Sequence, residues 1–253
     1  VAIALLLAGC SSSSPLIPSI YLISLWYDKS APPTYNGAIV DPTTPRLIGD
    51  IVKNAHMETR VGYFGVCVNP TGGSWLCSAN ASSLAAQIQT EDDPLNLIWV
   101  ADTFRANIVF PYLLIIAVIL AFITLLILAT YPNSDREYEN GPTRRRLPGL
   151  FISQISLAVI FVAGIFVLVS VLWQHTASVA AATIAANLGN GSIESGVGVT
   201  SMVLGWFSFA LLMIVVIGLL VMILSIHLVE RLADREEYDD DDLEDDDDLR
   251  GDR

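Results

Sequence analysis

Two cysteines, Cys67 and Cys77, are the residues of this sequence whose spacing most directly suggests covalent chemistry. They lie in two runs rich in aromatic and β-branched residues, 60–68 and 74–80, which flank a turn of Asn, Pro, Thr and Gly. This pattern predicts a β-hairpin with one cysteine on each arm, at disulfide distance. Closing so short a loop would stabilise the fold by roughly 2–3 kcal/mol. The alternative is two unrelated buried thiols. The compartment in which this segment lies decides between the two, because disulfides require an oxidising environment.

Carboxylates gather in two places where they could attract a cation. Glu91, Asp92 and Asp93 precede Pro94 and could hold a metal ion, although a helix-terminating turn is the plainer interpretation. The acidic segment 236–248 could bind Ca²⁺ weakly, but it lacks the spaced glycine and loop pattern of a dedicated site. A solvated, disordered tail is the plainer interpretation of that segment. Weak Ca²⁺ binding is therefore the only cofactor interaction that the residues suggest.

Catalytic patterns do not emerge from the remaining polar residues. The sequence shows no Ser/His/Asp arrangement, no His-x-x-x-His and no glycine-rich phosphate loop, and its three histidines are scattered. These observations favour a protein that is not an enzyme. Half of the 26 acidic residues lie between 234 and 252, and such an acidic end argues against nucleic acid as a partner.

Long uncharged runs predict a membrane protein, since 53% of the residues are hydrophobic and only 15% are charged. We expect transmembrane helices at 108–131, 150–173 and 199–229. Residues 1–14 are apolar but too short to span, so we interpret them as the outer part of a first transmembrane helix whose N-terminal part is missing. A signal peptide, or a lipobox ending at Cys10, is the alternative there; a small buried hydrophobe is the expected role of Cys10.

Arginine placement predicts the orientation of these spans. The loop 132–149 carries four arginines, whereas 174–198 carries none, so both termini and the 132–149 loop should be cytoplasmic. The loops 15–107 and 174–198 are then extracellular, and 230–253 forms an acidic disordered cytoplasmic tail. Two glycosylation sequons, at Asn80 and Asn190, and both cysteines fall on the predicted outside, which favours the disulfide over free thiols.

The large outer loop should contain a small sheet. Residues 19–27 suit a strand, 28–50 are loop-like, and 82–89 should form a short helix. A strand beside the 60–80 hairpin gives at least three antiparallel strands. The predicted fold is therefore a mainly α membrane protein: a four-transmembrane-helix bundle with a small antiparallel extracellular β-sheet.

The hairpin resembles a known signature. Gly62-Tyr63-Phe64-Gly65-Val66-Cys67 followed by Cys77 is similar to the glycine–two hydrophobics–glycine–x–Cys…Cys pattern of the fungal pheromone-induced calcium regulator and membrane fusion proteins, within the claudin-like four-span superfamily. The stretch 7–13, Leu-Ala-Gly-Cys-Ser-Ser-Ser, also looks like that family. The motif departs from true claudins, which have a Trp before the first Cys where this chain has Phe64.

The resemblance implies a plasma membrane protein with a part in low-affinity calcium influx and in cell or membrane fusion during fungal mating. It assigns Gly62, Gly65, Cys67 and Cys77 a structural role. Membrane lipids, other membrane proteins such as calcium channel subunits, and further copies of the chain are the implied partners. Two alternatives stay open: a claudin-like scaffold without an ion role, and an oligomeric ion channel. No carboxylate lies at the centre of spans two to four, which makes a channel in its own right less expected.

Overall fold

A computed structural model describes residues 1–27, 43–70, 72–130, 150–188 and 192–248 of the 253-residue chain. The chain divides into two compact units, Val1–Val118 with Ile165–Ala210, and Ile119–Gly164 with Leu211–Arg253. The first unit contains the sheet and both cysteines of the predicted disulfide. Among the described residues, the second contains parts of three long helices, the last of which includes the acidic segment.

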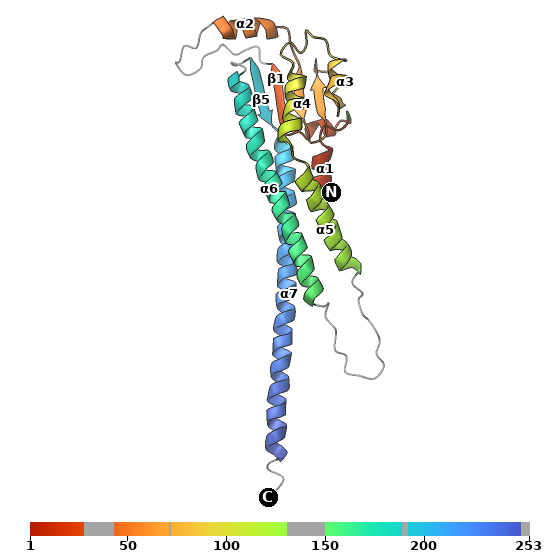
Figure 1. Ribbon diagram of the computed structural model, residues 1–253, viewed down its shortest axis with the longest axis vertical. Helices are drawn as coiled ribbons and strands as arrows, with labels where there is room; N and C mark the ends of the chain where they lie inside the picture. Colours follow the sequence, from red (N-terminus) through yellow and green to blue (C-terminus); the bar gives the residue numbers. More distant parts are fainter. Residues whose placement is uncertain (28–42, 71, 131–149, 189–191, 249–253) are drawn as a thin grey trace. The chain divides into compact units, whose positions relative to one another are not determined.

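An antiparallel five-stranded sheet forms the centre of the first unit (Figure 1). Its strands are β1 (Ile23–Tyr27), β2 (Glu58–Val61), β3 (Val66–Asn69), β4 (Leu76–Ser78) and β5 (Ile193–Val197). They lie in the order β4-β3-β2-β1-β5. The predicted small antiparallel sheet is therefore confirmed, with five strands where the sequence analysis expected at least three.

The prediction that residues 60–68 form one strand, the first arm of the hairpin, was wrong. It divides into β2 and β3 around the four residues 62–65, and Val61 pairs with Val66 on the two sides of this turn. Gly62 and Gly65 interrupt the aromatic and β-branched run, and glycine inside a strand pattern marks a tight turn or a close backbone approach. The cysteine-bearing hairpin is therefore β3–β4, and β2 precedes it.

The fifth strand comes from a segment that we expected to be a loop. Residues 174–198 begin as helix, because α6 (Leu150–Leu188) continues beyond Trp173, where the third span was expected to end. Alanines dominate 177–186, and alanine is the strongest helix former, so the helix continues once the apolar run ends. The chain then enters β5, which pairs with β1 from Ile23 opposite Val197 to Tyr27 opposite Ile193.

Short helices cover the sheet. They are α2 (Thr43–Val52), α3 (Ala81–Ala85) and α4 (Leu97–Ile108), with a 3₁₀ helix at Ile17–Ser19. Neither α2 nor α4 was expected, and α3 is shorter than the predicted 82–89. Leu97, Ile98 and Ala101 of α4 pack into one core with Val61, Val66 and Val68 of the sheet. Burial of these side chains gives the sheet its hydrophobic face.

Three helices among the described residues are long and apolar enough to cross a membrane. They correspond to Tyr112–Thr130 in α5, Ile152–Asn187 in α6 and Val199–Val229 in α7. The predicted first span is represented by α1 (Ala2–Ala8), whose seven residues extend about 10 Å. A four-span bundle thus stays a prediction, while the described residues form a mainly helical fold with three helices that are long and apolar enough to cross a membrane.

The last helix also differs from the expected disordered tail. α7 (Val199–Asp248) continues well past Val229 into the acidic segment. No glycine or proline occurs between Leu219 and Arg250, so nothing in the local sequence breaks the helix.

Candidate functional site

The predicted disulfide between Cys67 and Cys77 is present. The two residues lie directly opposite each other on β3 and β4, with their Cα atoms 4.0 Å apart. Cys67 is fully buried and lies on β3, an inner strand of the sheet, whereas Cys77 lies on β4, which forms an edge of the sheet. The bond therefore fastens an edge strand of three residues to the interior of the sheet.

The two signature glycines permit a close backbone approach. The turn between β2 and β3 is closed by a hydrogen bond of 2.9 Å from the Gly62 N–H to the Gly65 carbonyl oxygen. A Cβ atom on Gly62 would overlap the carbonyl oxygen of Gly9, and one on Gly65 would overlap that of Cys10. Both glycines are thus required because the N-terminal segment passes directly over the turn.

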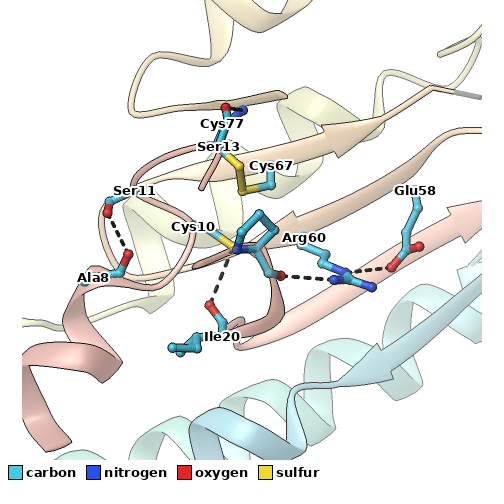
Figure 2. The surroundings of a disulfide bond; sticks show 10 residues. Ala8, Cys10, Ser11, Ser13, Ile20, Glu58, Arg60, Cys67 and Cys77 are labelled. Atoms are coloured by element: carbon cyan, nitrogen blue, oxygen red, sulfur yellow. Dashed lines mark hydrogen bonds and ion pairs between the residues drawn. A yellow bond between two sulfur atoms is a disulfide. The ribbon is translucent and has the colours of Figure 1, made fainter. Parts of the chain in front are cut away.

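We call residues 9–13 the N-terminal strap. It begins where α1 ends, and Cys10 adopts the left-handed conformation with φ of 55°. The Cys10 N–H donates to Ile17 O at 3.2 Å, and its side chain is fully buried, as expected of a small hydrophobe. Further along, Ser13 Oγ accepts a hydrogen bond of 3.1 Å from the Cys77 N–H. The strap therefore contacts both the turn and the disulfide-bearing edge strand, and Figure 2 shows Ser13 of the strap beside Cys77.

Two arginines join the segments around this assembly. Arg60 on β2 donates to Pro18 O at 3.1 Å and pairs with Glu58 at 2.8 Å (Figure 2). Its guanidinium lies 4.7 Å from the ring centre of Tyr21 and 4.0 Å from that of Trp75, which are cation–π distances. Its planar cation thus joins the chain before β1 to the loop before β4.

Arg105 on α4 contacts the signature turn directly. It donates to the carbonyl oxygens of Ala79 at 2.7 Å and Phe64 at 3.3 Å, and it pairs with Asp102 at 2.6 Å. One side chain therefore fixes the signature turn and the end of β4 to the helix that covers the sheet. Neither arginine was predicted as a site residue, because neither belongs to a spaced motif in the sequence.

The two aromatic residues of the turn point to different surroundings. Tyr63 is 5% exposed, and its hydroxyl donates to Gln174 Oε1 of α6 at 2.8 Å. Burial raises the pKa of Tyr63 above its ordinary value. A small pocket beside it, also lined by Phe110 and Trp173, has a volume of about 10 Å³, room for a single water molecule. Phe64, by contrast, is 43% exposed, so the turn presents one aromatic ring to its surroundings.

The predicted carboxylate cluster is not assembled as a metal site. Asp93 is buried; its Oδ1 accepts from Tyr27 Oη at 2.7 Å and from Leu97 N at 2.7 Å, and its Oδ2 accepts from Ile98 N at 3.2 Å. It therefore caps α4, while Glu91 is exposed. Across the part of the chain that the structure describes, no group of three His, Cys, Asp or Glu side chains could hold a metal ion. Burial, followed by the bond to Asp93, raises the pKa of Tyr27 above its ordinary value.

The first of the two sequons is exposed. Asn80 is the N-cap of α3, and its Oδ1 accepts hydrogen bonds from Ser82 N at 3.0 Å and Ser82 Oγ at 2.7 Å. Its amide nitrogen, the atom that a glycan would modify, takes no part in these two bonds. Asn190 lies outside the described residues.

Comparison with known families decides the assignment. Residues 48–225 match a family model described as Ca²⁺ regulator and membrane fusion protein Fig1. The chain belongs to this family. No curated protein matches it.

The family match covers the signature turn, both disulfide cysteines and the three apolar helices up to Ser225 in α7. The N-terminal strap lies outside the matched range, yet it contacts the signature glycines and Cys77. Membership connects the chain with calcium regulation and membrane fusion, and the family is described as a regulator and not as an enzyme. The predicted family resemblance is thereby confirmed.

Proposed function

We propose that this chain is a non-enzymatic plasma membrane protein that regulates low-affinity calcium influx and promotes cell or membrane fusion during fungal mating. Its disulfide-bearing sheet faces the cell exterior, and its two termini are cytoplasmic. It acts through contacts of the sheet and of its membrane helices with other membrane proteins, which include calcium channel subunits or further copies of itself.

One observation carries the proposal: the family signature forms a single packed unit. The turn 62–65, the disulfide and the strap meet at one place, and Arg105 bonds to the turn and to the residue that follows β4. Three-residue strands such as β4 are weakly held by backbone hydrogen bonds alone. A covalently fastened edge with an exposed Phe64 is suited to binding a partner, because aromatic rings on a rigid support favour protein contacts.

The apolar helices support regulation more than conduction. The three candidate spans contain no Asp, Glu, Lys or Arg, so they offer no charged ring of the type that attracts cations into a pore. A chain that influences calcium entry through such helices would do so by lateral contact with a channel.

Calcium uptake in a fungal strain that lacks the chain tests the function. We expect reduced pheromone-induced uptake and less frequent mating-pair fusion, both restored by the wild-type chain but not by Cys77→Ser. Gln89→Ser, which changes an exposed side chain outside the strap and the disulfide, is the control, and all variants are compared at surface levels equal to that of the wild type. Unchanged uptake with a fusion defect would favour the claudin-like scaffold. Calcium flux across the membrane of liposomes that contain only the purified chain would favour an oligomeric channel.

The proposed orientation has its own test. If the sheet is outside, Asn80 and Asn190 are glycosylated, and replacing each with Gln removes one glycosidase-sensitive shift in mobility. An epitope in the 132–149 loop should be reached by antibody only after permeabilisation. Staining of intact cells at that loop would overturn the orientation.

A further inference from the structure

The small pocket beside the signature turn is polar on one side. Four buried polar side chains line it there: Tyr63, Ser170, Gln174 and Ser178. The Tyr63 hydroxyl donates to Gln174 Oε1 at 2.8 Å, a bond that uses the carbonyl oxygen of that amide and neither of its N–H donors. None of the described residues that line the pocket is charged. The pocket therefore suits a neutral group that both donates and accepts hydrogen bonds.

The size of the pocket restricts that group further. Its volume of about 10 Å³ is room for a single water molecule, and a hydroxyl group is of similar size. The head group of a phospholipid is much larger and carries a phosphate. A phosphate is bound in proteins by Arg, Lys or a helix N-terminus, and the lining residues provide no such cation.

Two aromatic rings form the opening of the pocket. Phe110 and Trp173 are each 49% exposed, while the other lining residues are buried or half-buried. The two rings meet edge to face with their centres 6.0 Å apart, and Trp173 Nε1 donates to Ile108 O at 2.8 Å. These contacts hold the Trp173 ring in place, so the opening is formed before a ligand binds.

An apolar stripe on α6 continues from this opening. Ile165, Val169 and Trp173 are spaced by four residues, so they lie on one face of the helix, and all three are exposed. The stripe extends about 12 Å along the helix. It belongs to the candidate span of α6, and the candidate span of α5 begins at Tyr112, two residues after Phe110. Because aromatic residues concentrate where a span meets the membrane surface, the opening lies at that boundary and the stripe faces the lipid chains.

We propose that this pocket binds a membrane sterol, whose hydroxyl group enters the polar pocket while its flat ring system lies against Trp173 and the stripe. A sterol matches the site because its polar part is one neutral hydroxyl. Its fused rings are rigid, so little conformational freedom is lost when it binds. The placement of the site in the outer leaflet rests on the proposed function, but binding itself requires only that α5 and α6 lie in a membrane.

Photocrosslinking of the full chain in phosphatidylcholine nanodiscs tests the site. The probe is a diazirine-bearing sterol with a free hydroxyl group. We expect saturable labelling near Phe110 and Trp173, located by peptide mapping and displaced by the unlabelled sterol. The methyl ether of that sterol should not displace the probe, because it is too large for the pocket and cannot donate a hydrogen bond. Displacement by diacylglycerol, which also has one hydroxyl group but flexible chains, would overturn the assignment to a sterol.

Variants of the pocket locate the binding. Gln174→Leu removes the amide at similar size and should weaken displacement by the unlabelled sterol about fivefold to tenfold, the effect of one lost hydrogen bond. Ala177→Leu places a larger side chain at the pocket and should have the same effect, which keeps the test decisive if Gln174→Leu does not fold. Tyr27→Phe is the matched control, because its buried hydroxyl bonds to Asp93 and lies outside the pocket.

Thermal denaturation gives a second readout. The sterol should raise the denaturation midpoint of the wild type and of Tyr27→Phe but not that of Gln174→Leu. Equal labelling of all variants, or unsaturable labelling spread along the apolar helices, would overturn the site and leave water as the occupant of the pocket. Such a result would not affect the proposed function, whose own failure would show as unchanged calcium uptake in the strain that lacks the whole chain.

Discussion

In the sheet, Val61, Val66 and Val68 are fully buried, whereas on α5 Phe122 and Leu125 are 59% and 60% exposed. Both regions contain apolar side chains, but the surroundings of these side chains differ. Sheet side chains fill defined positions against named neighbours, and small changes there alter packing. Helix side chains of a membrane protein face lipid that is as apolar as they are, so composition matters there more than identity.

Loss of the disulfide should have the largest effect and would test whether the sheet depends on single residues. Cys77→Ser leaves β4 attached by three residue pairs and the bond from Cys77 N–H to Ser13. Removing a native disulfide from a small domain costs roughly 2–5 kcal/mol. We expect retention inside the cell and faster proteolysis of the sheet, measured by surface biotinylation and limited digestion. Wild-type surface level would show that the strap and the arginines suffice without the bond.

Glycine substitution compares the two regions directly. Gly65→Ala places a methyl group against the Cys10 carbonyl, a backbone atom that cannot move aside, and should destabilise by about 1–3 kcal/mol. Gly164→Ala on α6 meets nothing within 4 Å and should be neutral or mildly stabilising, because alanine favours helix by about 1 kcal/mol. Thermal denaturation of the detergent-solubilised chain measures both. Equal losses would mean that the helix position is packed as tightly as the turn.

Sequence patterns were sufficient wherever one physical rule dominates. Charge-free runs gave the helices α5, α6 and α7, and turn residues between β-rich runs gave the cysteine hairpin. They failed where distant segments meet. The pairing of β5 with β1 joins residues about 170 apart, and neither the strap over Gly62 nor the bond from Tyr63 to Gln174 leaves a periodic signal.

The acidic cluster illustrates the same limit. Three consecutive carboxylates gave a weak candidate for a cation site beside the plainer interpretation as a turn, and in the structure Asp93 instead accepts hydrogen bonds from the first turn of α4 and from Tyr27. α4 itself was missed because its inward residues, Leu97, Ile98 and Ala101, pack on the sheet, and α4 lies directly before the much stronger apolar run of α5. Local propensity does not show which face of a short helix a sheet will cover.

Replacing Asp93 distinguishes the capping role from metal binding. Asp93→Ala removes the acceptor of two α4 amides and leaves the buried Tyr27 hydroxyl without that partner, a loss of about 1–3 kcal/mol. Asp92→Ala is the matched neighbour and should stay within about 0.5 kcal/mol. Thermal denaturation with and without Ca²⁺ reads out both variants. A Ca²⁺-dependent stabilisation that both substitutions abolish would restore the cation site.

The pH dependence of the free energy of unfolding should be the smallest effect, because it appears only at alkaline pH. It still distinguishes the sheet from the apolar helices. The pKa values of Tyr27 and Tyr63 are raised from the ordinary 10.0 by burial, so below pH 10 both are neutral in the folded and unfolded chain. Above pH 10 the unfolded chain loses these protons while the folded chain keeps them, so the free energy of unfolding falls as pH rises. The slope is about 1.4 kcal/mol per pH unit for each tyrosine.

Tyr27→Phe and Tyr63→Phe should each remove one tyrosine's contribution to this slope. Ultraviolet titration of tyrosinate should show at least two tyrosines that ionise only on unfolding. If both ionise in the folded chain near pH 10, the hydroxyl contacts to Asp93 and Gln174 do not exclude water, and the sheet region is no more tightly specified than the helices.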